Sequence, residues 1–251
     1  MGKFTLLVFL LLGADLGLGS RAEASSFTVN PVKITLSGKE QSALLGLQNQ
    51  SDEEIRFKIV PQAWQQSPDG EMQLQDTKDV VVFPTLLTLG PKQMRKLRVG
   101  ITTAPGDVEK NYRVFVEELP PLKSPKADKS EVRVLTKMGI PIFIAPGKPT
   151  VAGVVDGMAV GKGKLAFTLK NTGSVHFLAQ TILVRGLDAA GAAVFEKKLE
   201  GWYVLAGGTR VWKVEMPTGT CAKTKAVSVD VQAVETTFNG RMTMPAAGCG
   251  P

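Results

Sequence analysis

Two short acidic runs and a single histidine are the residues of this chain that could support acid–base catalysis. The acidic runs are residues 52–54 (Asp-Glu-Glu) and Glu117-Glu118, and two nearby carboxylates can act as the acid and the base of a glycosidase. The first run lies in a turn pattern, and adjacent residues of a strand, such as Glu117 and Glu118, point to opposite faces of a sheet. Neither run is therefore expected to bring two carboxylates together in a cleft.

Metal and phosphate chemistry have no better support. His176 is the only histidine and follows a turn pattern beside Phe177, so we expect it to have a packing or surface role. Gly161-Lys-Gly-Lys164 resembles part of a phosphate-binding loop, but the full spacing is missing and no helix pattern follows, which predicts a turn. There is no G-x-S-x-G nucleophile elbow. We expect no enzyme activity, no metal and no other cofactor.

The charge of the chain favours anionic partners in general. It has 30 Lys and Arg against 23 Asp and Glu, a formal net charge of +7. The basic residues are scattered, and the sequence has no recognition-helix, zinc-finger or aromatic-stacking signature. We expect no nucleic-acid partner.

The N-terminus predicts export. Residues 1–24 contain a lysine, an apolar run from Phe4 to Ala14 and an Ala-Glu-Ala ending at Ala24, which is the pattern of a cleaved signal peptide. The apolar run is about half of the ~20 residues that a membrane-spanning helix needs. We expect no membrane insertion of the mature chain, and a retained anchor is the alternative.

The two cysteines are expected to pair. Cys221 and Cys249 both lie near the C-terminus of a chain expected to be exported, where oxidation is the usual outcome. A disulfide closing a loop of that size would stabilise the fold by about 3–4 kcal/mol. A free reactive thiol is the alternative.

The composition predicts an all-β protein. Val, Thr, Ile and Phe recur at two-residue spacing, and Gly or Pro interrupts the pattern every eight to twelve residues. Seven candidate strands lie in the first half, from Phe27–Leu36 to Val132–Ile144, and seven in the second, including Lys164–Asn171. The segment 145–149 is typical of a short, proline-stiffened hinge. We therefore expect two immunoglobulin-like sandwich domains, residues 25–146 and 150–251.

The last two candidate strands of the first half carry cations among apolar residues. A hairpin centred near Pro125 would place Arg113 opposite Lys137 and Glu117 opposite Arg133. Facing like charges cost stability unless solvent or an anion separates them, so a carboxylate ligand is one explanation. Two solvated side chains on an exposed face are the other.

The final strand of the first half also has one nearly continuous apolar face. Val132, Val134, Thr136, Met138 and Ile140 follow strict two-residue spacing. Such a face ordinarily packs into the core. The functional alternative is an edge strand offered to a partner protein by β-augmentation.

The mature chain resembles the periplasmic pilus-assembly chaperones of the chaperone–usher pathway. The resemblance depends on motifs that occur in this order: Asn30-Pro-Val-Lys-Ile34, Leu47-Gln-Asn49, Phe83-Pro84, Leu89-Gly-Pro-Lys-Gln93, Tyr112-Arg-Val-Phe-Val-Glu-Glu-Leu-Pro120 and Gly139-Ile-Pro-Ile-Phe143. Each motif is short, and their common order and spacing make the match specific.

The resemblance implies a boomerang (L-shaped) pair of immunoglobulin-like domains that binds fimbrial subunits in the periplasm and passes them to an outer-membrane usher. By this resemblance the strand lent to the subunit is 132–138, with Val132, Val134, Thr136 and Met138 as the inserting side chains. It also implies basic residues that anchor the carboxylate at the C-terminus of the subunit, and the matching candidates are Lys33, Arg113 and Lys137. A secreted two-domain adhesion or scaffold protein is the alternative function.

The chain departs from the better-known members of that family at two places. Pro141 stands near the position of their cleft lysine, which shifts the expected basic role to Lys137. Glu109 matches one residue of their interdomain salt bridge, but Ala145 and Thr236 or Thr237 replace its partners. The chain is more similar to the divergent, archaic-type branch, in which Tyr112-Arg113 and Ile140-Pro141-Ile142-Phe143 recur, and the salt bridge is expected to be incomplete.

Overall fold

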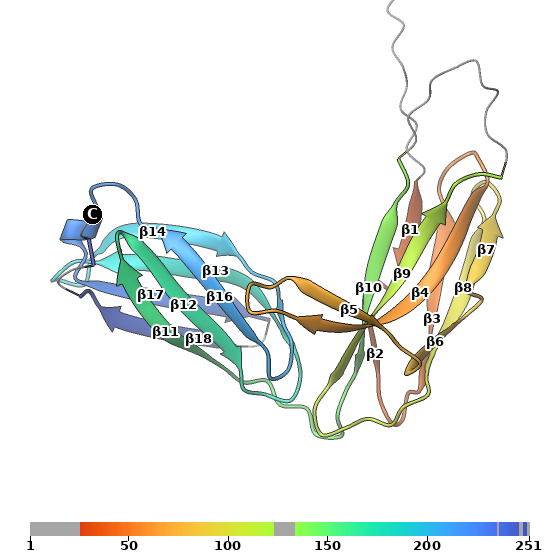
Figure 1. The fold of residues 1–251 in the computed structure, drawn as a ribbon, viewed down its shortest axis with the longest axis horizontal. Coiled ribbons are helices and arrows are strands. Elements are labelled where there is room, and N and C mark those ends of the chain that lie inside the picture. The colour runs from red at the N-terminus through yellow and green to blue at the C-terminus, as the bar shows by residue number, and fades with distance from the viewer. Residues whose placement is uncertain (1–25, 123–133, 235, 246–247, 250–251) are drawn as a thin grey trace, which may run out of the picture.

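The computed structural model describes residues 26–122, 134–234, 236–245 and 248–249. It consists of two β-sandwiches that meet at an angle and give the molecule an L shape (Figure 1). The fold class expected from the sequence is therefore confirmed. The predicted signal peptide, Arg133 and the first predicted inserting residue, Val132, lie outside the described residues. In the described part of the chain, no helix is long and apolar enough to cross a membrane.

The N-terminal sandwich is built from two sheets. One has the order β1-β3-β8-β6, and the other has the order β2-β10-β9-β4-β5, with β7 paired to β4. The strands are β1 (Phe27–Asn30), β2 (Ile34–Leu36), β3 (Ser42–Asn49), β4 (Ile55–Gln66), β5 (Met72–Asp76), β6 (Val80–Phe83), β7 (Leu86–Leu89), β8 (Met94–Ile101), β9 (Lys110–Leu119) and β10 (Lys137–Ile144). The segment Phe27–Leu36, expected as one strand, is divided at Pro31, and its two parts join different sheets.

Alternation of side chains along each strand fills the N-terminal core. Leu45 and Leu47 of β3 and Ile140 and Ile142 of β10 are buried, and they meet between the two sheets. The residues between them on each strand face away from this core, as the two-residue period requires. This alternation leaves one outward face of the β2-β10-β9-β4-β5 sheet turned toward the second sandwich (Figure 1).

The C-terminal sandwich contains the sheets β11-β12-β16 and β14-β13-β17-β18, with β15 paired to β13. Its strands are β11 (Gly153–Gly161), β12 (Lys164–Asn171), β13 (Phe177–Leu187), β14 (Ala193–Glu200), β15 (Tyr203–Val204), β16 (Thr209–Glu215), β17 (Ala226–Ala233) and β18 (Thr237–Thr243). A 3-10 turn, η1 (Cys221–Lys223), begins at Cys221, which forms the predicted disulfide with Cys249.

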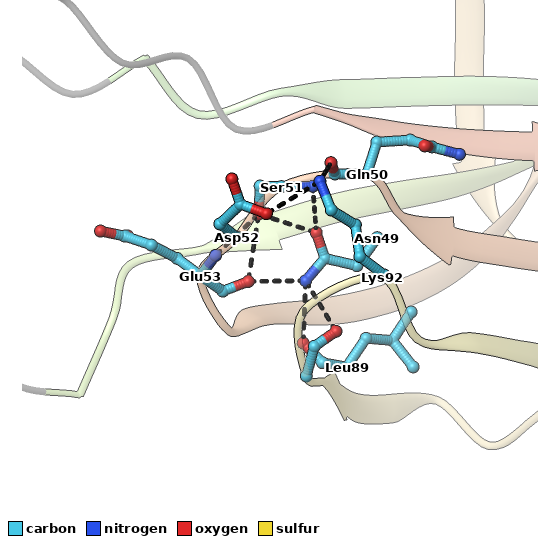
Figure 2. A network of polar contacts seen from close by, with 8 residues as sticks. Asn49, Gln50, Ser51, Asp52, Glu53, Leu89 and Lys92 are labelled. Atoms are coloured by element: carbon cyan, nitrogen blue, oxygen red, sulfur yellow. Dashed lines mark hydrogen bonds and ion pairs between the residues drawn. The ribbon is translucent and has the colours of Figure 1, made fainter.

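A buried asparagine closes one corner of each sandwich. The Asn49 side-chain amide donates to the carbonyls of Leu89, Gly90 and Glu53, and its Oδ1 accepts from Ser51 (Figure 2). Asn171, at the end of β12, donates to Val175 and Val204 in the same way. Both side chains satisfy backbone carbonyls that would otherwise be buried without a partner. In both sandwiches the asparagine is the last residue of a strand, β3 or β12, and a bend follows it within two residues.

The predicted register of β9 and β10 is wrong by four residues. Arg113 lies opposite Pro141, and Lys137 lies opposite Glu117, so the two cations do not face each other. The observed register places Ile140 opposite Val114 and Ile142 opposite Tyr112, and all four side chains are buried in the core. A shift of four residues leaves every side chain on the same face, so the alternation in the sequence does not distinguish the two registers. The turn residues near Pro125, on which the prediction was based, do not determine this register.

Candidate functional site

The outward face of the large N-terminal sheet is the most informative surface of the molecule. We call it the cleft face and define it by the residues of β4, β9 and β10 that alternate with the core residues. Its members, from the domain junction outward, are Trp64, Asn111, Phe143, Gln62, Arg113, Pro141, Val60, Phe115, Gly139, Lys58, Glu117 and Lys137. Aromatic rings occupy the inner end, and charged groups lie farther out.

Arg113 is a buried cation on this face. Only 7% of the residue is exposed, and its guanidinium carbon lies 4.2 Å from the centre of the Trp64 ring. Nη1 makes one long contact of 3.5 Å with the Gly139 carbonyl, and Nε has no partner. Burial lowers the pKa of Arg113, yet a guanidinium stays charged in proteins. Among the described residues, Arg113 has no carboxylate partner.

Lys137, in contrast, has its charge compensated. Its Nζ lies 2.6 Å from Glu117 Oε1 and 4.5 Å from the centre of the Phe115 ring. About half of the lysine side chain is exposed. In the described part of the chain Glu117 therefore pairs with Lys137, and its predicted partner, Arg133, lies outside the described residues.

Lys33 lies on the other side of Pro141 from Arg113. Strand β2 runs parallel to β10 with Ile34 beside Ile142, and one step back along this register brings Lys33 beside Pro141. Ile34 is buried in the core, so the neighbouring lysine points to the cleft face. Lys33, the residue before β2, therefore continues a row with Pro141 of β10 and Arg113 of β9, about 10 Å wide at the backbone.

The outer half of β10 has an open edge. Strand β2 covers only Ile142, Phe143 and Ile144, and within the described residues no strand pairs with the 137–141 edge on that side. Thr136 exchanges hydrogen bonds with the Glu118 backbone and carboxylate, so the alternating pattern turns the backbone groups of Lys137 and Gly139 to the uncovered side. Gly139 is needed there because a Cβ atom would lie 2.8 Å from the Phe115 ring.

The three described residues that were expected to insert into a subunit differ in burial. Val134 is 55% exposed, whereas Thr136 is half-buried and Met138 packs against the edge of the N-terminal core. The next residue of the series, Ile140, is fully within that core. The apolar face therefore passes from core packing at Ile140 to free exposure at Val134.

A histidine joins the two sandwiches. The His176 ring stacks on Phe143 with ring centres 3.6 Å apart, and Glu109 Oε1 lies 2.7 Å from His176 Nδ1 and accepts from its backbone N–H at 3.1 Å. His176 thus has the packing role expected from the sequence. Glu109, whose interdomain salt bridge was expected to be incomplete, has His176 as its partner across the junction. The sequence signal that could have predicted this contact is the position of the only histidine, directly before Phe177, the first residue of β13.

A second contact between the sandwiches comes from the hairpin β4–β5, which extends to the C-terminal sandwich (Figure 1). The backbone N–H of Val211 on β16 donates to the Pro68 carbonyl at 2.9 Å. Gly70 leaves room for Arg210, because a Cβ there would lie 2.0 Å from the guanidinium carbon. The junction is therefore held from two directions.

Replacing Glu109 with alanine should lower the free energy of unfolding by about 2–3 kcal/mol, because two buried hydrogen bonds are lost and the His176 N–H is left unpaired. Urea unfolding measures this. Asp107→Ala, an exposed acid in the same loop, is the control and should change stability by less than about 0.5 kcal/mol. Equal effects of the two substitutions would contradict a role of Glu109 in the junction.

Comparisons with known proteins agree with this architecture. Residues 26–149 match the family described as pili and flagellar-assembly chaperone, PapD N-terminal domain. Among solved structures, the CsuC–CsuE chaperone–tip adhesion subunit pre-assembly complex of archaic Csu pili from Acinetobacter baumannii is similar, with a TM-score of 0.57 and 16% identity over 88% of this chain and 99% of the other. The Salmonella enterica SafA pilin–SafB chaperone complex has a TM-score of 0.56 and 16% identity over 88% and 99%.

Pseudomonas aeruginosa chaperone CupB2 is also similar, with a TM-score of 0.52 and 13% identity over 87% of this chain and 100% of that chain. At these identities the solved structures establish the common fold. The search of curated proteins finds no match.

Proposed function

Residues 26–149 belong to the family of pilus and flagellar-assembly chaperones, and from this premise we propose that the protein is a periplasmic chaperone that binds incomplete fimbrial subunits and delivers them to an outer-membrane usher. The single observation that carries the proposal is the open edge of β10 beside the row of Lys33, Pro141 and Arg113. This edge offers unpaired backbone groups and buried positive charge at one place.

The open edge binds the subunit by β-augmentation. Backbone groups of Lys137 and Gly139 pair with a strand of the subunit, and the segment from 132 to 138 supplies the strand that the subunit lacks. The exposed Val134 side chain then enters the apolar groove of the subunit, followed by Val132, Thr136 and part of Met138. No cofactor is involved, because the subunit completes its own folding only when another strand replaces β10.

The cations anchor the C-terminal carboxylate of the subunit. Arg113 is buried without a carboxylate partner in the described part of the chain, and Lys33 lies exposed on the far side of Pro141. A carboxylate over Pro141 would compensate both charges at once. By sequence Lys137 belongs to both expected anchor pairs, Lys33 with Lys137 and Arg113 with Lys137, but its ion pair with Glu117 favours Lys33 and Arg113.

The similar structures support this proposal, since the CsuC–CsuE and SafA–SafB structures are complexes of a chaperone with an adhesion subunit or a pilin. We infer that this chain has subunit partners of the same kind. A two-domain adhesion protein would have no reason to keep an open, partly apolar edge, because such edges are normally protected.

Co-expression of the full chain with a fimbrial subunit encoded beside it should give a stable one-to-one complex in periplasmic extracts. Lys33→Ala should weaken the complex about tenfold through the lost anchor charge, whereas Lys39→Ala, an exposed lysine of the turn before β3, should leave affinity unchanged. Affinity purification and titration of the complex measure this. If the neighbouring subunits are degraded equally with and without the chain, the proposed function is wrong.

A further inference from the structure

A small hollow lies at the junction of the two sandwiches, next to the proposed anchor. Its volume is about 220 Å³, and its lining includes Lys33, Val151, His176, Leu178, Tyr203 and Val234. It is smaller than the roughly 300–1,000 Å³ of typical small-molecule sites. A hollow of this size suits a single large side chain.

The walls of the hollow are mainly aliphatic and aromatic, and two of their rings are fixed in position. The His176 ring is held by Phe143 on one side and by Glu109, and Tyr203 packs edge-on against Trp64 with ring centres 5.7 Å apart. The rim residues Val151 and Val234 are 43% and 67% exposed although they are aliphatic. Among the described residues that line the hollow there is no aspartate or glutamate, and Lys33 gives it a positive edge.

Two residues connect the hollow with the anchor row. Lys33 lines the hollow and also lies beside Pro141. Tyr203 lines the hollow and packs on Trp64, the ring over which the Arg113 guanidinium lies. If the C-terminal carboxylate of the subunit is held between Lys33 and Arg113, the side chain of the same terminal residue lies at the mouth of the hollow.

We propose that this hollow receives the side chain of the last residue of the captured subunit and that the chaperone thereby selects subunits ending in a large apolar or aromatic residue. The inference rests on the proposed function. A terminal aspartate side chain would lose hydration against the apolar part of the lining and would compete with the subunit's own C-terminal carboxylate for Lys33. A terminal glycine would leave the apolar walls uncovered.

The test compares one fimbrial subunit, from the gene beside the chaperone, in four forms that end in Phe, Leu, Gly or Asp. Dissociation constants for the unchanged full-length chaperone are measured by titration. The Phe and Leu forms should bind about 10- to 100-fold more tightly than the Gly form, and the Asp form should bind most weakly.

A matched pair of chaperone variants locates the effect. Val151→Trp fills the hollow from its rim and should remove the preference for Phe and Leu. Val154→Trp adds the same side chain at a site of equal exposure, 42%, outside the lining and should keep the preference. Thermal unfolding checks that both variants fold. The comparison of the four subunit forms with the unchanged chaperone does not depend on these variants.

The outcomes separate the two proposals. Equal affinity of the unchanged chaperone for all four subunit forms, or an unaltered preference in a folded Val151→Trp variant, would overturn the role of the hollow and leave the chaperone function intact. Failure to bind any form of the subunit would instead contradict the proposed function itself.

Discussion

Replacing Arg113 with methionine should abolish subunit capture while leaving the free protein as stable as before, or more stable. Capture is lost because the subunit carboxylate would lose its buried partner, a loss of about 2–5 kcal/mol or more, which is roughly 30-fold to several thousandfold in affinity. Stability is kept because Arg113 is a buried charge with an unpartnered Nε, and a methionine can pack on Trp64 in its place. Titration of the subunit and urea unfolding of the free chain measure the two effects.

The opposite signs of these two effects distinguish an anchor from a structural residue. If Arg113 only supported the fold, its replacement would lower both the stability of the free protein and its capture of the subunit. Arg113→Lys should give intermediate capture, because the charge remains but the planar group that stacks on Trp64 is lost.

Lys137→Met is the matched control on the neighbouring strand. It removes a half-exposed ion pair with Glu117, so both stability and affinity should change by less than about 1 kcal/mol. If Lys137→Met abolished capture and Arg113→Met did not, the anchor would be Lys137, the other candidate that the sequence provides.

The features that could be predicted from the sequence are those with local signals. Two-residue alternation and turn residues indicated the all-β class, and strand β12 has the predicted bounds, Lys164–Asn171. The disulfide between Cys221 and Cys249 followed from expected export and from the count of cysteines. The family resemblance followed from the order of short motifs, each of which is also local.

The features that escaped prediction depend on contacts between distant segments. The parallel contact of β2 with β10 brings Ile34 beside Ile142 and so creates the row with Lys33, and nothing near either strand announces it. The contact of Glu109 with His176 joins residues 67 positions apart across the junction. The register of β9 and β10 is not distinguished by the alternation of side chains, because a shift of four residues keeps every side chain on its face.

Contacts between distant segments also explain why the sequence identifies the candidate anchor residues by type but not their arrangement. The three cations proposed as anchors are ordinary lysines and an arginine in the sequence. Packing separates them into a buried guanidinium, a paired surface lysine and an exposed lysine beside a hollow. Burial and pairing, and not composition, decide which of them is free to bind an anion.

Replacing Val134 with aspartate should weaken subunit capture by at least a hundredfold without destabilising the free chaperone. Val134 is 55% exposed in the free chain, so a carboxylate there stays in water and should alter the free energy of unfolding by no more than about 0.5 kcal/mol. In the complex the same carboxylate would enter an apolar groove without a partner, at a cost of several kcal/mol. Urea unfolding measures the effect on the stability of the free chain, and titration with the subunit measures the effect on affinity.

Two further aspartate substitutions show whether the lent strand has the proposed orientation. Leu135→Asp changes the adjacent residue, 43% exposed but on the opposite face of the strand, and should weaken capture only a few-fold. Met138→Asp should unfold or strongly destabilise the free chain, because this side chain packs against the core that contains Ile140. A larger loss of capture for Leu135→Asp than for Val134→Asp would reverse the face that enters the subunit, and unfolding by Val134→Asp would assign that residue to the core of the chaperone itself.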